Sequence, residues 1–238
     1  MNTRKLEGKW ALVTGSSRGI GQQIAMGLAQ YGCNVILHGR TMAHTEKTRQ
    51  MLAGFDVRIH AVAGDLGTED GIQSVITEVQ HFPGYADILY NNAAIQSEWK
   101  PIFEFSMEDW LKSFQVNLFA MICFCNAFVP GMAERGYGRV INLTSGIADQ
   151  PNLSPYSVTK AAVDKYSRDL AFAVKENNVL VNYLDPGWLR TDLGGPNAWE
   201  AVETVLPGAL VPALLDDNGP TGRLYAAQDY KVLGQGIT

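Results

Sequence analysis

The chain has 238 residues, which is enough for one large domain or two small ones with a sizeable buried core. Its net charge of −5 at pH 7 argues against a nucleic-acid-binding surface or a basic membrane-binding patch, so small molecules are the expected partners. No apolar run reaches the length of a membrane span, and the N-terminal MNTRKLEGKW lacks the apolar stretch of a secretory signal.

Short apolar runs alternate with periodic segments along the whole chain. The apolar runs predict strands, and the segments with a period near 3.6 predict helices. In chain order we expect a strand at 9–14, a helix at 20–28, a strand at 34–38, a helix at 43–53, a strand at 57–62, a helix at 68–81, a strand at 87–90, a helix at 106–132, a strand at 139–143, a helix from 154, a strand at 179–184, a helix at about 197–215 and a strand at 223–226.

These seven strands are too apolar to alternate cleanly between buried and exposed positions, which is typical of strands covered on both faces. Strands that alternate with helices favour parallel pairing. The predicted fold is therefore a Rossmann-type, doubly wound parallel α/β sheet flanked by helices. No linker or low-complexity segment interrupts the pattern, so we expect a single domain over residues 1–238.

In a sheet of this kind, ligands bind beyond the carboxyl ends of the strands. Glycine-rich or polar motifs that could bind a ligand follow the first six strands at that end. They are TGSSRGIG, GR, GDL, NNAAI, TS and DPGW. If these motifs had only a structural role, each of them would need a separate explanation. The sequence therefore predicts one ligand site along this edge of the sheet.

The segment GSSRGIG, at 15–21, follows the first predicted strand and opens the first predicted helix. Its glycines stand where a tight turn, a close phosphate and close helix packing would need them, although the usual spacing is Gly-x-Gly-x-x-Gly. A structural turn is the alternative. The residues expected to bind a dinucleotide phosphate are Gly15, Ser17, Arg18, Gly19, Ile20 and Gly21.

The end of the second predicted strand should distinguish NAD from NADP. An acidic residue there would bind the ribose 2′-hydroxyl of NAD, but the sequence has Arg40, with Arg18 in the glycine loop. Two guanidinium groups and no carboxylate suit a 2′-phosphate. We therefore expect NADP(H), while solvated surface arginines are the alternative.

Tyr156 and Lys160 form a single Tyr-x-x-x-Lys pair, and on a helix residues four apart share a face. Ser154 and Pro155 predict that the helix starts here, with the Ser154 hydroxyl as its cap. A phenol with a pKa of roughly 10 is a poor proton donor or acceptor at neutral pH unless a nearby cation lowers that pKa. The pair suggests proton-transfer chemistry, whereas a packed tyrosine and a solvated lysine are the alternative.

Taken together, these motifs resemble the short-chain dehydrogenase/reductase family over essentially the whole chain. TGSSRGIG, NNAAI, the Tyr-x-x-x-Lys pair and PGWLRT stand in the family's order. The resemblance implies that Tyr156 donates a proton to a substrate carbonyl and that Ser145 hydrogen-bonds the same oxygen. It also implies that Lys160 lowers the Tyr156 pKa and holds the nicotinamide ribose, and that Asn117 bends its helix and anchors a water of the proton relay.

The same resemblance implies further cofactor contacts, each of which could instead be structural. Asp65 and Leu66 would lie beside the adenine, and the segment 92–94 would lie along the ribose. The nicotinamide would be surrounded by the segment 186–191. The implied residues of these two segments are Asn92, Ala93, Ala94, Pro186, Gly187, Trp188 and Thr191.

Three departures from the family pattern bear on the site. Ala94 replaces a glycine, which places a methyl group near the cofactor. Ser145 precedes Tyr156 by eleven residues, about two fewer than is common, so one wall of the site is shortened. The C-terminal GRLYAAQDY lacks the Asp-Gly-Gly ending frequent in the reductases of fatty-acid synthesis, which weakens that assignment.

The segments PGWLRTDLGGP and NGPTGRLY look most like carbonyl reductases, with a short substrate loop at about 188–200. The resemblance therefore implies an NADPH-dependent reductase of ketones, aldehydes or quinones. The alternatives are an alcohol or sugar dehydrogenase working in the oxidative direction and a catalytically silent dinucleotide sensor. The expected apolar walls of the substrate site are Trp99, Ile147, Pro151, Trp188 and Leu193.

Cys33, Cys123 and Cys125 have neither disulfide nor zinc-site spacing, and we expect them to be small buried residues of a cytoplasmic protein. The four histidines are scattered, so no metal site is predicted. A dimer, a tetramer and a monomer are all compatible with the sequence.

Overall fold

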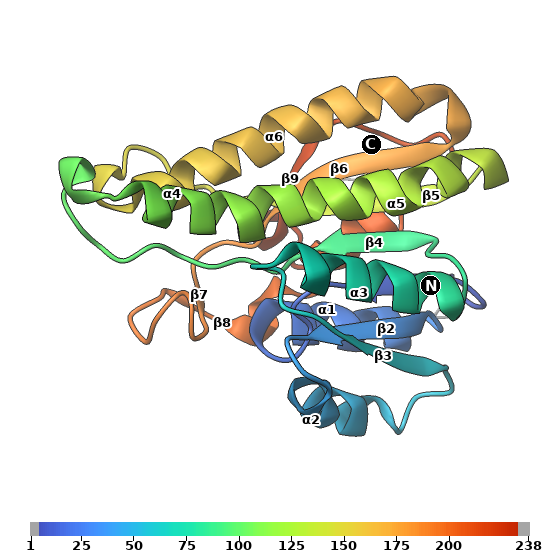
Figure 1. The fold of residues 1–238 in the computed structure, drawn as a ribbon. Coiled ribbons are helices and arrows are strands. Elements are labelled where there is room, and N and C mark those ends of the chain that lie inside the picture. Colours follow the sequence, from blue (N-terminus) through green and yellow to red (C-terminus); the bar gives the residue numbers. More distant parts are fainter. Residues whose placement is uncertain (1–4, 233–238) are drawn as a thin grey trace.

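Apolar strands of three to seven residues form the centre of the molecule, which the computed structural model describes over residues 5–232 (Figure 1). Seven strands pair in parallel in the order β3-β2-β1-β4-β5-β6-β9. Their bounds are β1 Trp10–Val13, β2 Asn34–Gly39, β3 Ile59–Ala63, β4 Ile88–Asn91, β5 Gly138–Leu143, β6 Val179–Asp185 and β9 Leu224–Ala226. The predicted doubly wound parallel sheet is confirmed.

Alternate residues of each central strand point to opposite faces of the sheet, and each face has its own core. Ala11 and Val13 pack with α1 and α2, whereas Trp10 and Leu12 pack with α3, α5 and α6. Figure 1 shows α6 running beside α4 and α5 along one side of the sheet. The helix bounds are α1 Gly19–Gln30, α2 Met42–Leu52, α3 Glu69–His81, α4 Met107–Phe114, α5 Ala120–Arg135 and α6 Ser154–Val174.

A long helix between β4 and β5 consists of α4, a π-helical segment at Gln115–Phe119 and α5. It begins with the predicted capping box, in which Ser106 and Asp109 each accept a hydrogen bond from the other's backbone N–H. By length and composition it could cross a bilayer, but half of its most apolar window is buried. A helix that packs one face against a sheet accounts for this composition.

The helix predicted at about 197–215 is wrong. The structure instead has two short strands, β7 (Leu189–Arg190) and β8 (Glu200–Ala201), followed by 3₁₀ turns at Val202–Val205 and Gly208–Ala213. Pro207 and Pro212 lack the N–H that an α-helix needs, and each disfavours helical backbone in the residue before it. The apolar residues resembled a helical stripe because this irregular segment still covers α1 with its buried side chains.

Two local predictions are also wrong. Ser154 is not the cap of α6, because the 3₁₀ turn Pro151–Leu153 runs directly into the helix and makes Leu153 the capping residue. Cys123 is exposed, whereas Cys33 and Cys125 are buried as expected. Residues two apart on a helix point in different directions, so α5 buries one of its cysteines and exposes the other.

Candidate active site

The glycine-rich loop lies at the carboxyl end of β1, beside β4, where the strand order reverses and doubly wound sheets bind their ligands. Gly15 has a φ of +64°, and a Cβ there would lie 3.0 Å from Ala93 Cα. A Cβ on Gly21 would lie 2.5 Å from the Gly15 oxygen. Both positions therefore require glycine on steric grounds, which explains their spacing.

The N-terminus of α1 is suited to an anion. Arg18 caps the helix without a side-chain hydrogen bond, and the first turn contains no acidic residue. The first N–H groups, with the positive end of the helix dipole, are therefore open to a phosphate. Ser17 and Ile20 flank this point and are partly buried. The residues present therefore fit the pyrophosphate of a dinucleotide.

Arg18 itself is exposed and forms a 2.8 Å ion pair with Asp192, from the loop that follows β6. The two side chains are 69% and 70% exposed, so the pair contributes at most about 1 kcal/mol. Gly19 lies under the same loop, since a Cβ there would be 3.4 Å from the Thr191 methyl group. The loop after β6 thus reaches across the glycine-rich loop.

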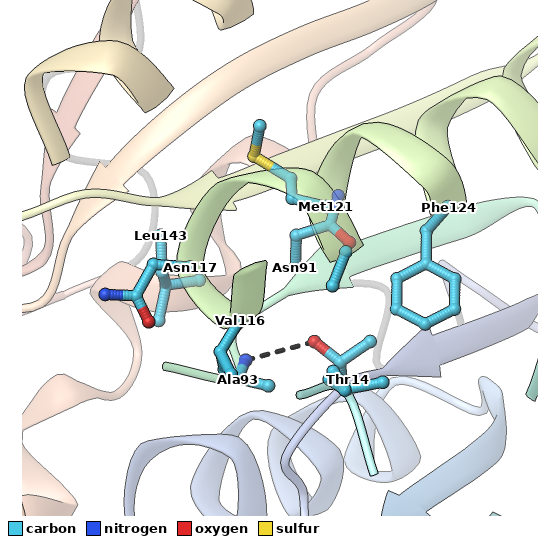
Figure 2. Close-up of a pocket in the computed structure, with 10 residues that line it drawn as sticks. Thr14, Asn91, Ala93, Val116, Asn117, Met121, Phe124 and Leu143 are labelled. Atoms are coloured by element: carbon cyan, nitrogen blue, oxygen red, sulfur yellow. Dashed lines mark hydrogen bonds between the residues drawn. The ribbon is translucent and has the colours of Figure 1, made fainter. Parts of the chain in front are cut away.

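The loop after β4 is tied to the glycine-rich loop by Thr14 and Asn92. Thr14 Oγ1 accepts a hydrogen bond of 2.9 Å from the backbone N–H of Asn92. It accepts a second one, of 3.0 Å, from the backbone N–H of Ala93 (Figure 2). Asn92 Nδ2 donates to the oxygens of Thr14 and Gly15, at 2.8 and 3.2 Å. The Asn92 side chain therefore holds the two loops together. If the segment 92–94 contacts the cofactor, it would do so through atoms other than the Asn92 side chain. Ala94, in the same segment, is partly buried.

Arg40 and Asp65 are exposed beyond β2 and β3, and Leu66 is buried beside them. Asp65 Oδ1 accepts a hydrogen bond of 2.9 Å from Gly67 N, so this carboxylate also shapes its own turn. Leu66 and Asn91 line a cavity about the size of one water molecule (Figure 2). Asn91 Oδ1 is buried there and has no hydrogen-bond partner among residues 5–232.

Tyr156, Lys160 and Ser145 meet at the carboxyl end of β5. Ser145 lies directly beyond that strand, and despite the short connection its hydroxyl is close enough to the phenol of Tyr156 to oppose the rise in the phenol's pKa. Lys160 Nζ lies 5.6 Å from the centre of the Tyr156 ring and donates a 2.8 Å hydrogen bond to the Leu143 oxygen. Tyr156 and Lys160 are 8% and 4% exposed. The short wall therefore does not prevent Ser145 from reaching the tyrosine.

Asn117 lies inside the π-helical segment, a kind of bulge common at functional sites. Its side chain pairs with the loop after β4, because Oδ1 accepts from Ile95 N at 2.8 Å and Nδ2 donates to Ile95 O at 2.9 Å. Nδ2 also donates to Thr159 Oγ1 at 3.1 Å. Asn117 thus connects the long helix to α6 beside Lys160.

Burial raises the pKa of Tyr156, while the hydrogen bond from Ser145 opposes the shift and the charge of Asp185 adds to it. Burial lowers the pKa of Lys160 to about 8, against the field of Asp164. The lowering of the tyrosine pKa by Lys160, which the family resemblance implies, stays a prediction, since burial makes the net shift of that pKa upward. The Lys160 ammonium donates its hydrogen bond to the Leu143 oxygen. Burial raises the pKa of the Tyr156 phenol more than Ser145 lowers it.

The loop after β6, residues 186–201, folds back on itself. Pro186 O accepts a 3.1 Å hydrogen bond from Gln228 Nε2, and Gly187 turns with a φ of +83°. Trp188 Nε1 donates to Gly194 O at 2.8 Å, and its ring meets Trp199 edge-on with centroids 5.3 Å apart. Most of the loop's hydrogen bonds therefore join residues close in sequence.

The predicted apolar walls differ in exposure. Ile147 is half-buried, whereas Trp99, Pro151, Trp188 and Leu193 are exposed. Their apolar surface is accessible to a ligand. The larger part of this surface lies on loops, not on the sheet.

Sequence reasoning missed three residues of this site. Thr14 joins two loops, and Asp185 approaches the active site so closely that a Cβ on Gly146 would lie 2.5 Å from its Oδ2. His38 accepts a hydrogen bond from Gly15 N on its ring Nδ1, at 3.0 Å. A signal was available for His38, because it interrupts an otherwise apolar run in β2.

The model of the short chain dehydrogenase family matches residues 9–200. The gluconate 5-dehydrogenase of Gluconobacter oxydans is 32% identical over 190 residues, covering 79% of this chain and 74% of that protein. The 3-oxoacyl-[acyl-carrier-protein] reductase FabG of Aquifex aeolicus is 34% identical, covering 79% and 77%. The structure of a gluconate 5-dehydrogenase from Burkholderia cenocepacia, in complex with NADP and tartrate, superposes with a TM-score of 0.81 at 27% identity, covering 94% of this chain and 95% of that chain. With this match and the geometry above, the chain belongs to the short-chain dehydrogenase family of oxidoreductases.

Proposed function

We propose that this protein is an NADPH-dependent reductase that transfers hydride to the carbonyl group of a ketone, an aldehyde or a quinone, with Tyr156 as the general acid. The observation that carries the proposal is a buried tyrosine that lies beside Ser145 and next to a buried lysine. A phenol that is protonated at neutral pH can donate its proton to the carbonyl oxygen, and a neighbouring cation makes that transfer easier because it stabilises the phenolate left behind.

The bound nicotinamide would supply the hydride. Tyr156 would hold the proton for the carbonyl oxygen, and the Ser145 hydroxyl would hydrogen-bond that oxygen and so orient the substrate. The buried Lys160 ammonium would stabilise negative charge on the phenol once the proton has left. Asn117 would position Lys160 through Thr159.

NADP is supported over NAD by two arginines, Arg18 in the glycine-rich loop and Arg40 directly after β2, where NAD would need an acidic residue. Arg40 is exposed beyond β2 and Arg18 is engaged in a weak, solvent-exposed pair with Asp192. Arg18 can therefore exchange its carboxylate partner for a 2′-phosphate at little cost. The Burkholderia structure with NADP bound is consistent with this assignment.

A second candidate is a sugar-acid dehydrogenase working in the oxidative direction. It is favoured by the similarity to gluconate 5-dehydrogenases. The exposed tryptophans of the loop after β6, which we propose to be the substrate loop, favour apolar or aromatic carbonyls instead. We further propose that the protein acts in the cytoplasm, where its free thiols would stay reduced.

The proposal is tested by following NADPH oxidation at 340 nm with a panel of ketones, aldehydes and quinones, with gluconate plus NADP in parallel. We expect turnover with apolar carbonyls and little with the sugar acid. Turnover with gluconate alone would establish the second candidate. Tight NADPH binding without turnover of any carbonyl or alcohol would indicate a sensor.

The cofactor assignment is tested separately with Arg40→Asp. A charge-assisted hydrogen bond contributes roughly 1.5–3 kcal/mol, so its loss should reduce the NADPH-to-NADH preference in kcat/KM by about ten- to a hundredfold. Arg49→Asp, in the last turn of α2, is the matched control. An unchanged preference in Arg40→Asp would place the 2′-phosphate contacts elsewhere.

A further inference from the structure

His38 is buried near the end of β2 and uses both ring nitrogens. Nδ1 accepts a hydrogen bond from Gly15 N at 3.0 Å, and Nε2 lies 3.0 Å from the Gly64 oxygen. A backbone nitrogen only donates and a backbone oxygen only accepts. The ring is therefore neutral, with its hydrogen on Nε2.

These two bonds join the segments on either side of the expected adenosine site. Gly15 is the first residue of the glycine-rich loop, and Gly64 directly precedes Asp65 and Leu66. The backbone of His38 holds the same loop through Ser16, whose N–H donates to His38 O at 3.1 Å and whose Oγ accepts from His38 N at 2.9 Å. The loop is thus anchored to β2, and the imidazole extends that anchor to β3.

We propose that His38 is a positioning residue for NADP(H) binding: its neutral imidazole aligns Gly15 with the end of β3, and its protonation releases Gly15 and weakens cofactor binding. The inference rests on the proposed function, since it requires the dinucleotide to bind at the glycine-rich loop. His38 would not itself touch the cofactor. It acts through Gly15 and Gly64.

Protonation has this effect because it places a hydrogen on Nδ1, where the Gly15 N–H now donates. Two donors then face each other, and one of them must move. Gly15 has little freedom to move toward the β4 side, because Ala93 Cα already lies 3.0 Å from the site of a Cβ and Asn92 holds the Gly15 oxygen. The expected displacement therefore disturbs the turn that faces the phosphates.

The charges around His38 set the direction of its titration. Burial lowers its pKa, against the Gly64 carbonyl and the carboxylate of Asp65. On the glycine-rich loop Arg18 is exposed and paired with Asp192, and on α2 His44 is hydrogen-bonded to Thr41. The neutral form therefore predominates at pH 7, and release of Gly15 belongs to acidic pH, below the ordinary histidine value of about 6.5.

The experiment measures the Kd of NADPH by fluorescence titration from pH 5.0 to 8.0 for the wild type, His38→Gln and His38→Leu. Glutamine can accept from Gly15 and donate to Gly64 but does not titrate, whereas leucine does neither. We expect the wild-type Kd to rise about tenfold more than that of His38→Gln between pH 7.5 and 5.0. His38→Leu should bind about tenfold more weakly than the wild type at pH 7.5, and the loss should fall on the KM for NADPH rather than on kcat.

Any pH dependence that does not come from His38, including that of the cofactor's own 2′-phosphate, is common to the wild type and His38→Gln, so it cancels in their comparison. Equal pH dependence in these two proteins would overturn the proposal even if His38→Leu did not fold. Undiminished affinity in a folded His38→Leu would overturn it as well. Failure of the wild type to bind NADPH at any pH would remove the cofactor assignment and this inference together, whereas binding without a pH difference removes this inference alone.

Discussion

The residues around Tyr156 and the loop after β6 lie at the same edge of the sheet but are held in opposite ways. Lys160 and Asn117 are buried, and their hydrogen bonds reach Leu143 and Ile95, in other elements of the fold. In the loop, Trp188 is 46% exposed and its hydrogen bond reaches a residue six positions along the chain. A change in the first region removes buried polar partners, whereas a change in the second leaves the core intact.

The difference suggests a division of labour. The chemistry would be a property of the packed core, common to every substrate, and the choice of substrate would be a property of a loop that folds largely on its own. Substitutions around Tyr156 should lower turnover equally for all substrates, whereas substitutions in the loop after β6 should lower it unequally. These two results together would sharpen the contrast. The opposite pattern would break it.

The largest effect is expected for Tyr156→Phe. The substitution removes the proton donor but little contact area, so kcat should fall by about 10²- to 10⁴-fold for every carbonyl that the wild type accepts. Single-turnover NADPH oxidation with several substrates measures this, with the Kd of NADPH as the control for an intact cofactor site. A loss confined to some of the substrates would show that another group supplies the proton.

Lys160→Met should abolish turnover while it stabilises the protein at neutral pH. Lys160 is 4% exposed and burial lowers its pKa to about 8, compared with about 10.4 in an unfolded chain. The shift corresponds to a cost of about 3 kcal/mol, fully present below pH 8 and lost as the pH rises from about 8 to 10.4. The hydrogen bond to Leu143 O offsets about 1 kcal/mol of it.

Urea unfolding at pH 7 and at pH 10.5 measures this effect. The variant should be more stable than the wild type by about 2 kcal/mol at pH 7, and the advantage should disappear at pH 10.5. An equal difference at the two pH values would mean that the buried ammonium is not the source of the cost. Lys165→Met, at an exposed position of α6, is the matched control and should show no advantage.

Trp199→Ala tests the loop side of the comparison. It removes an edge-to-face aromatic pair worth about 0.5–1.5 kcal/mol and exposes Trp188 further. The ratio of kcat/KM between bulky and small carbonyls should change by about three- to tenfold, with the melting temperature nearly unchanged. Phe172→Ala, another exposed aromatic residue, on α6, should leave the ratio unaltered. An equal loss for all substrates would assign the loop to chemistry.

The smallest effect is expected for Asp192→Asn, which frees Arg18 from its exposed ion pair. Such pairs contribute up to about 1 kcal/mol and are screened by salt, so the KM for NADPH should change by less than about fivefold. Any gain should be largest at low ionic strength, because the freed guanidinium can meet the 2′-phosphate. Asp169→Asn, paired with Lys165 on α6, is the control. A loss of tenfold or more would make the loop part of the cofactor site.

The features readable from the sequence are those that depend on near neighbours in the chain. Apolar runs and helical periodicity predicted the seven strands and the parallel sheet, and the capping box predicted the start of α4. The motif at 15–21 predicted a tight turn that needs glycine, and in the structure a Cβ does not fit at Gly15 or Gly21. In each case a few neighbouring residues are enough to predict the local backbone conformation.

Local patterns failed where a distant partner decides the structure. The apolar residues of 197–215 suggested a helix, but their burial comes from α1, and Pro207 and Pro212 leave them in turns. The Tyr-x-x-x-Lys spacing brought Tyr156 and Lys160 onto one face. It could not show that burial would raise one pKa and lower the other, because desolvation depends on everything packed around them.

The sequence by itself therefore determined the sheet, the edge at which ligands are expected, and the residue types gathered there. The tertiary structure alone decided that His38 joins the glycine-rich loop to β3, that Arg18 meets Asp192, and that Lys160 is a buried cation. The physical reason is the distance along the sequence over which each interaction acts. Backbone conformation follows from steric and hydrogen-bonding preferences over a few residues, whereas burial and charge are set by segments that meet only after the chain has folded.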